Sequence, residues 1–206
     1  MFAIVESGSI TSMPKGNKGV EINGVKHPIS IFTLWTESER NAIGVYTIEI
    51  DNTNLKDDAW YVNTNITYAY DSSAKKVKGT YGTATAKPHA DTTYTNTDKS
   101  NGDIPTGKNV GDVKEEGLKT VLIRQVKRKA QEILNETDWY ITRNAEKSTA
   151  IPSAITTHRD AVRTKQASME TAITNAADTP ALETLYTYTT TDGVTSRPLG
   201  ELPTLE

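Results

Sequence analysis

VKEEGLKTVLIRQVKRKAQEIL, residues 113–134, is the stretch that decides how the second half of the chain folds. Its apolar residues recur three and four positions apart: Val113, Leu118, Val121, Leu122, Val126, Ala130, Ile133 and Leu134. This spacing places them on one stripe of a helix, while the opposite face is basic and polar. We therefore predict an amphipathic helix over residues 111–136.

A second amphipathic helix is predicted to begin near Pro152, which suits a first helical position. Its stripe consists of apolar residues seven apart, with one more beside them: Ile155, Val162, Met169, Ala176 and Ile173. Asp138-Trp139-Tyr140 interrupts the pattern between the two helices, and Pro180 is expected to end the second. Residues 113–180 therefore predict an antiparallel helical hairpin, whose stripes face each other or a partner.

Residues 1–86 have a strand-like pattern of short apolar or Thr-rich runs separated by Gly, Asn, Asp and Ser. The clearest hairpin joins Tyr61–Tyr70 to Lys76–Thr85 through a turn at residues 71–74. Because isolated two-stranded hairpins are rarely stable in water, this one should join a small antiparallel sheet.

Two further elements are predicted in the same region. The run Ile29–Leu34 follows Pro28, which favours the start or edge of a strand. Thr36-Glu-Ser-Glu39 has the spacing of a capping box, in which each end satisfies a backbone amide of the other, so a single helical turn should run through Asn41.

The remaining segments are polar. Residues 87–112 are rich in turn formers and charges, which predicts a linker or long loop. Residues 181–206 favour a small hairpin about Asp192-Gly193 followed by an extended arm. Leu199 and Leu202 in that arm are candidates for contact with another subunit, although a frayed end is an equal alternative. The predicted fold class is thus α+β: a small β domain, a polar linker, a helical hairpin and a C-terminal tail.

The composition favours a binding protein. Only 35% of the residues are hydrophobic, and Thr occurs 32 times, so little apolar surface can be buried per residue. Such a chain often gains stability from a partner or from homo-oligomerisation. The absence of Cys excludes disulfides and thiolate chemistry and fits a reducing cytoplasm. The N-terminus has no basic flank or cleavage site, so we do not expect a signal peptide.

The sequence contains no arrangement of catalytic residues that is typical of an enzyme. The three His residues, His27, His89 and His158, lack the spacing of a metal site, so we expect neither a metal nor another cofactor. His158-Arg159-Asp160 matches a kinase tripeptide, but the glycine-rich loop and the downstream Asn that a kinase needs are missing. Paired carboxylates, such as Glu37 with Glu39, are better explained as helix N-terminal residues. We predict that the chain is not an enzyme.

Nucleic acid and membranes are not expected as partners. The formal net charge is −3, which provides no general attraction for phosphate or anionic lipid. Arg124–Lys129 is the one basic cluster, but it is not interleaved with aromatic residues that could stack on bases. No stretch is long and apolar enough to span a membrane.

Residues 133–163, ILNETDWYITRNAEKSTAIPSAITTHRDAVR, resemble the tail-assembly chaperone domain encoded near the tail or tail-fibre genes of tailed bacteriophages. The matching positions, which lie within about residues 122–165, are Leu134, Asp138-Trp139, Pro152, His158-Arg159 and Val162-Arg163. His158 stands where the family has an aromatic residue. The run IFTLWTESERNAIGVYTIEI, residues 31–50, is similar to the small sheet domain that opens many tail-fibre accessory proteins.

The resemblance implies binding to a tail or tail-fibre subunit, in the host cytoplasm during assembly, with no catalytic residues. Trp139 is expected in the elbow between the helices, with Asp138 capping the turn. Arg159 and Arg163 lie four apart on one helical face and should contact a partner or acids of the first helix. Tyr140 completes the protein-binding candidates. The alternative is a structural subunit of the tail or baseplate that remains in the virion as a permanent connector.

Overall fold

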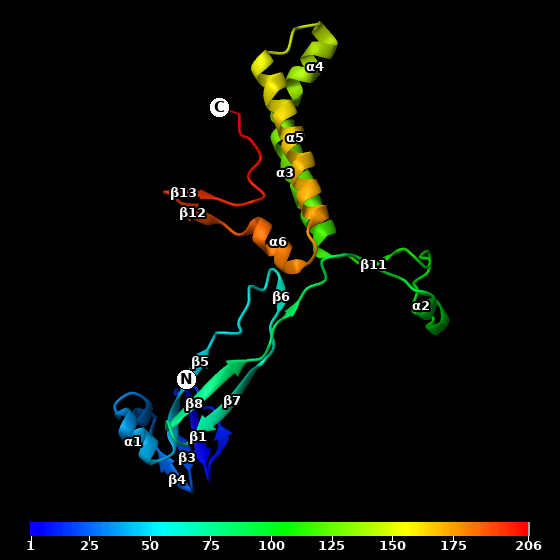
Figure 1. Ribbon diagram of the computed structural model, residues 1–206. Coiled ribbons are helices and arrows are strands. Elements are labelled where there is room, and N and C mark those ends of the chain that lie inside the picture. The colour runs from blue at the N-terminus through cyan, green and yellow to red at the C-terminus, as the bar shows by residue number, and fades with distance from the viewer. Residues whose placement is uncertain (206) are drawn as a thin grey trace. The chain divides into compact units, whose positions relative to one another are not determined.

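The computed structural model describes residues 1–205 and divides the chain into two compact units, one of residues 1–85 and one that begins at Ala86 (Figure 1). Strands dominate the first unit and helices the second, which confirms the predicted α+β class. Each unit has its own buried residues and is described by itself.

The first unit is built on a five-stranded sheet in the order β2-β1-β5-β8-β7. Neighbouring strands are antiparallel except β5 and β8, which are parallel, so the sheet is mixed and not purely antiparallel as predicted. The elements are β1 (Phe2–Glu6), β2 (Ser9–Ser12), β3 (Val20–Ile22), β4 (Val25–His27), η1 (Ile29–Phe32), α1 (Glu37–Ala42), β5 (Val45–Asp51), β6 (Tyr61–Val62), β7 (Ile66–Asp71), β8 (Lys76–Tyr81) and β9 (Thr85–Ala86).

Both faces of the central strands are buried. Alternate residues of a strand point to opposite faces, and the two resulting clusters are distinct. One contains Ala3, Val5, Tyr46, Ile48 and Val77, and the other contains Ile4, Val45, Ile22, Ile31 and Phe32. The second cluster explains why Ile29–Phe32 is a 3-10 helix and not the predicted strand: a strand would send the adjacent Ile31 and Phe32 to opposite faces, whereas here both are buried.

The predicted hairpin and capping box are both present. β7 and β8 pair from Ile66 opposite Tyr81 to Asp71 opposite Lys76. The Asp71 carboxylate accepts hydrogen bonds from the backbone amides of Ser73 and Ala74 in the turn, at 2.9 and 3.0 Å. Thr36 and Glu39 exchange the two reciprocal bonds of a capping box at the start of α1, so the sequence prediction is confirmed there.

The second unit is mainly helical. Its elements are β10 (Thr92–Thr93), α2 (Asn96–Asn101), β11 (Val113–Glu115), α3 (Leu118–Asn135), α4 (Asp138–Lys147), α5 (Ser153–Asn175), α6 (Thr179–Tyr186), β12 (Thr189–Thr191) and β13 (Val194–Ser196). α3 and α5 lie side by side (Figure 1). Leu122, Val126, Ala130 and Leu134 of the predicted stripe are buried on α3, and Ile155, Val162, Met169 and Ile173 are buried on α5. The predicted helical hairpin is therefore observed.

Residues 87–112 are more ordered than the predicted linker. They contain β10 and α2, and β10 pairs with β11. Asp91 accepts hydrogen bonds from the Gly117 amide at 2.7 Å and from the Thr120 hydroxyl at 2.9 Å. Because Gly117 has no side chain with which to cap α3, this distant carboxylate satisfies amide and hydroxyl donors at the helix start.

Two boundaries in the second unit also differ from the predictions. α3 begins at Leu118 and not at residue 111, because Val113 is paired in β11. α5 ends at Asn175, before Pro180 as predicted, but Pro180 itself lies in the first turn of a further helix, α6, where its missing amide costs nothing. The predicted C-terminal hairpin is present as β12 and β13. None of the helices in residues 1–205 is long and apolar enough to cross a membrane.

Candidate functional site: the junction of α3, α4 and α5

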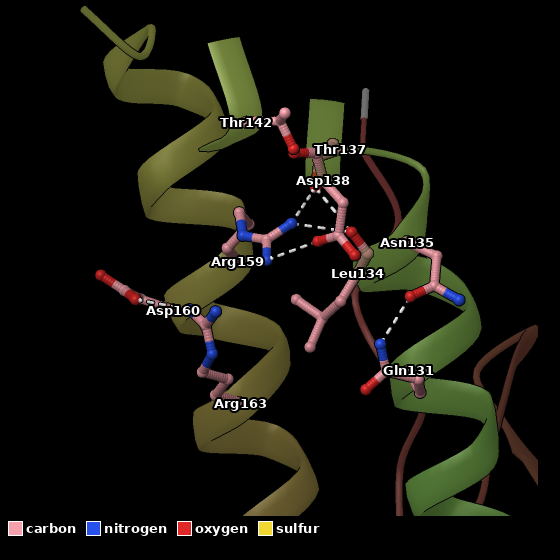
Figure 2. Close-up of polar contacts among 9 residues, drawn as sticks. All are labelled: Gln131, Leu134, Asn135, Thr137, Asp138, Thr142, Arg159, Asp160 and Arg163. Carbon is pink, nitrogen blue, oxygen red and sulfur yellow. Dashed lines mark hydrogen bonds and ion pairs between the residues drawn. The ribbon is translucent and has the colours of Figure 1, made fainter. Parts of the chain in front are cut away.

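Arg159 is the centre of the junction between the three longest helices. It lies on α5, and its guanidinium points to the corner where α3 ends and α4 begins (Figure 2). One nitrogen donates to the Leu134 carbonyl and to the Thr137 hydroxyl, both at 2.7 Å. The other terminal nitrogen forms an ion pair with Asp138 at 2.9 Å, and only 8% of the Arg159 side chain is exposed. One side chain thus joins three helices.

The Leu134 carbonyl explains why a positive charge is favourable at the C-terminal end of α3. The last carbonyls of a helix have no partner within it, and the helix dipole is negative at that end. Leu134 lies in the last turn of α3, and its carbonyl also accepts the Thr137 amide and hydroxyl, each at 3.1 Å. Arg159 therefore serves as a C-terminal cap for α3, supplied by another helix.

Asp138 does not cap the turn as predicted. α4 begins at Asp138 itself, and no side chain caps its N-terminus. The carboxylate instead faces Arg159, while half of its side chain remains exposed. A negative charge in the first turn of α4 is also favourable to that helix's dipole. The corner is consequently held by an ion pair that water still reaches on one side.

Trp139 is not in the elbow, where it was predicted, because its side chain is 51% exposed. Its ring stacks on Tyr140 with centroids 3.8 Å apart. The Arg143 guanidinium lies 4.8 Å from the Trp139 ring centroid and 5.7 Å from that of Tyr140. These three residues form what we call the α4 patch. The helical interruption predicted at Asp138-Trp139-Tyr140 was wrong, since these residues lie within α4.

The α4 patch has the composition of a protein-binding hot spot. Trp, Tyr and Arg are the residue types that contribute most to binding energy at protein interfaces. Their mutual stacking limits the rotamers available to each ring and so lowers the entropy lost on binding. Exposure of the indole leaves apolar area that a partner can cover.

The other predicted binding residues are not part of this patch. Arg163 is exposed and pairs with Asp160 on its own helix at 3.3 Å, not with the acids of α3 (Figure 2). Leu199 is buried, and its carbonyl accepts a 2.8 Å hydrogen bond from Lys165 of α5. Leu202 packs against the α3–α5 cluster of Ala130, Leu134 and Val162. The arm thus folds back on its own unit.

Two residues of the site were missed by sequence reasoning. Arg143 could have been found, because it lies four positions after Trp139 and hence on the same helical face. Thr137 carried no comparable signal, since its role depends on the corner that brings it to Arg159.

The chain matches no protein-family model, and no curated protein or solved structure is significantly similar to it. In the described part of the chain, no group of three or more His, Asp or Glu side chains is arranged to hold a metal ion.

Proposed function

We propose that this protein is a bacteriophage tail or tail-fibre assembly factor that acts by binding a tail protein through the α4 patch. The observation that carries the proposal is the exposed Trp139-Tyr140-Arg143 stack on a helix whose start is fixed by buried Arg159. The resemblance of residues 133–163 to tail-assembly chaperones supports the choice of partner. The role would be performed in the host cytoplasm, without catalysis or a cofactor.

One experiment tests both the partner and the surface. The chain is co-expressed with each tail and tail-fibre protein of its source phage, and the affinity of any complex is measured by titration calorimetry. Truncation of a hot-spot residue to Ala costs at least about 2 kcal/mol of binding free energy. Trp139→Ala should therefore weaken binding by more than about tenfold. Glu115→Ala, on an exposed residue outside the patch, is the control. Equal affinities for the two variants would reject the α4 patch, and no complex with any tail protein would reject the function.

A permanent connector of the tail or baseplate is the second candidate, and one observation favours it. Every residue of the two-stranded ribbon β12–β13 is exposed, and such ribbons are marginally stable in isolation. A neighbouring subunit that adds a strand would stabilise it. Quantitative mass spectrometry of mature particles distinguishes the candidates, because a connector is present at a fixed ratio to a tail protein, whereas an assembly chaperone is depleted.

A further inference from the structure

A cavity of about 410 Å³ lies between α3 and the C-terminal arm, residues 187–205. Its apolar lining includes Val126 and Ile133 of α3, Met169 of α5 and Leu202 of the arm. Val126 and Met169 are almost fully buried from solvent. Binding pockets for small groups have volumes of roughly 300–1,000 Å³, so this cavity is large enough for a bulky side chain and its neighbours.

The wall formed by the arm is held by a cluster around Arg197. Its guanidinium pairs with Glu201 at 2.7 Å and lies 5.2 and 5.1 Å from the rings of Tyr186 and Tyr188. The Tyr188 hydroxyl donates to Glu201 at 2.6 Å. Burial alone would raise the pKa of the Glu201 carboxyl, but the Tyr188 hydrogen bond and the Arg197 charge lower it overall. The charges of Arg197 and Glu201 therefore offset each other at the cavity wall.

The opposite rim, on α3, carries two carboxylates and one cation, Lys129, whose charge acts on Glu201 of the arm. Glu132 and Glu136 both line the cavity and are four residues apart, so they project from one helical face. Glu132 has only a long, exposed contact with Arg128 at 3.8 Å, and Glu136 has no ion pair within residues 1–205. Both carboxylates lie in the last turn of α3 or just beyond it, where the helix dipole adds negative potential.

We propose that the cavity binds a large apolar side chain of a protein partner whose adjacent residue is Lys or Arg. The apolar side chain would contact Val126, Ile133 and Met169, and the cation would lie between Glu132 and Glu136. The Glu132–Glu136 end of the rim is complementary to a cation next to an apolar side chain and disfavours an acidic residue there. Lys129 and Arg197 lie beside Glu201 on the arm's side. The proposal rests on the proposed function for its partner class, but it concerns a surface separate from the α4 patch.

The test uses the full chain and three acetylated, amidated heptapeptides of Gly and Ser that carry Phe-Lys, Phe-Glu or Ser-Lys at the centre. The ε-methyl groups of methionine are labelled with carbon-13 and followed by NMR. Met169 lines the cavity, whereas Met1 and Met13 are exposed residues of the other unit and serve as internal controls. We expect the Phe-Lys peptide to shift the Met169 signal at submillimolar concentration, the Phe-Glu peptide to bind at least fivefold more weakly, and the Ser-Lys peptide to leave the signal unchanged.

Two double variants test the rim. Glu132→Gln with Glu136→Gln should abolish the preference for Lys over Glu in the peptide. Glu115→Gln with Glu146→Gln changes the same charge at exposed positions outside the cavity and should leave the preference intact. The proposal is overturned if the Met169 signal does not move, if the Ser-Lys peptide is as effective as Phe-Lys, or if both double variants behave alike.

These outcomes are independent of those that test the function. If a tail protein binds the wild type and the Glu132→Gln, Glu136→Gln variant equally, the cavity proposal fails while the assembly role stands. If the peptides bind as expected but no tail protein is captured, the assembly role fails while the cavity remains a binding site.

Discussion

Replacement of Arg159 by Met should destabilise the second unit more than any substitution of an exposed charge in it. Met retains much of the aliphatic length but removes the guanidinium that caps α3 and contacts Thr137 and Asp138. The Leu134 carbonyl and the Thr137 hydroxyl then lose a charged donor in a buried place.

The expected loss of unfolding free energy follows from what each contact of Arg159 contributes. Hydrogen bonds to charged groups contribute about 1.5–3 kcal/mol, and breaking a buried ion pair costs about 3–5 kcal/mol. The full ion-pair value does not apply, because half of the Asp138 side chain is exposed and water can solvate its charge. The Leu134 carbonyl also keeps its bonds from Thr137. We therefore expect a loss of about 2–4 kcal/mol in the free energy of unfolding.

The assay is urea denaturation followed by circular dichroism at about 222 nm, a wavelength that reports helix, with midpoint and slope fitted for each variant. Arg163→Met is the matched control: its ion pair with Asp160 is exposed, so its loss should cost less than about 1 kcal/mol. Arg159→Lys should be intermediate, because an ammonium retains the charge but not the planar fork that reaches two acceptors at once. If Arg159→Met and Arg163→Met unfold at the same urea concentration, the capping role of Arg159 is refuted.

Two predictions concern the first unit. The hydrogen bond with Tyr70, together with burial, raises the pKa of Tyr46 to about 12. Since the folded-state pKa exceeds the unfolded value near 10, this contribution to stability is complete below about pH 10 and is lost as the pH rises to about 12. Carbon-13 NMR should show a lower Tyr46 pKa in Tyr70→Phe, and an unchanged value would contradict the assignment. Gly44 has φ 83°, and a Cβ there would lie 2.6 Å from the Val5 carbonyl oxygen. Gly44→Ala should thus lower the urea midpoint clearly more than Gly24→Ala, which has φ 78° but open space; equal midpoints would exclude the steric argument.

The elements that sequence predicts well are those fixed by local chemistry. The stripe of α3 is recognisable because burial of one face requires three- and four-residue spacing, and Leu122, Val126 and Leu134 are indeed buried. The Thr36–Glu39 capping box is equally local, since both bonds form within four residues. In contrast, the 3-10 helix at Ile29–Phe32 depends on a sheet face formed by other strands, which no pattern within four residues specifies.

The candidate site was predicted by residue but not by role. The resemblance drew attention to Asp138, Trp139 and Arg159; Asp138 and Arg159 meet at the helix junction, whereas the Trp139 ring is exposed on α4. Their expected roles assumed that residues 138–140 form a bend, with the large ring inside. Because α4 continues through this segment, the ring turns outward and Arg159 holds the corner instead. Helix in place of a bend at residues 138–140 therefore leaves Trp139 exposed and gives the structural role at the corner to Arg159.

The same corner determines how binding experiments on this protein must be designed. Glu136 of the cavity rim and Trp139 of the α4 patch lie three residues apart; Glu136 falls between the Leu134 and Thr137 acceptors that Arg159 holds, and Trp139 follows Thr137 by two residues. Loosening the corner would therefore displace both surfaces, and a binding defect in an Arg159 variant could not be assigned to either one. Trp139→Ala and the Glu132→Gln, Glu136→Gln variant change exposed side chains and leave the Arg159 contacts in place. These substitutions separate the two surfaces, provided that each variant unfolds at the wild-type urea concentration.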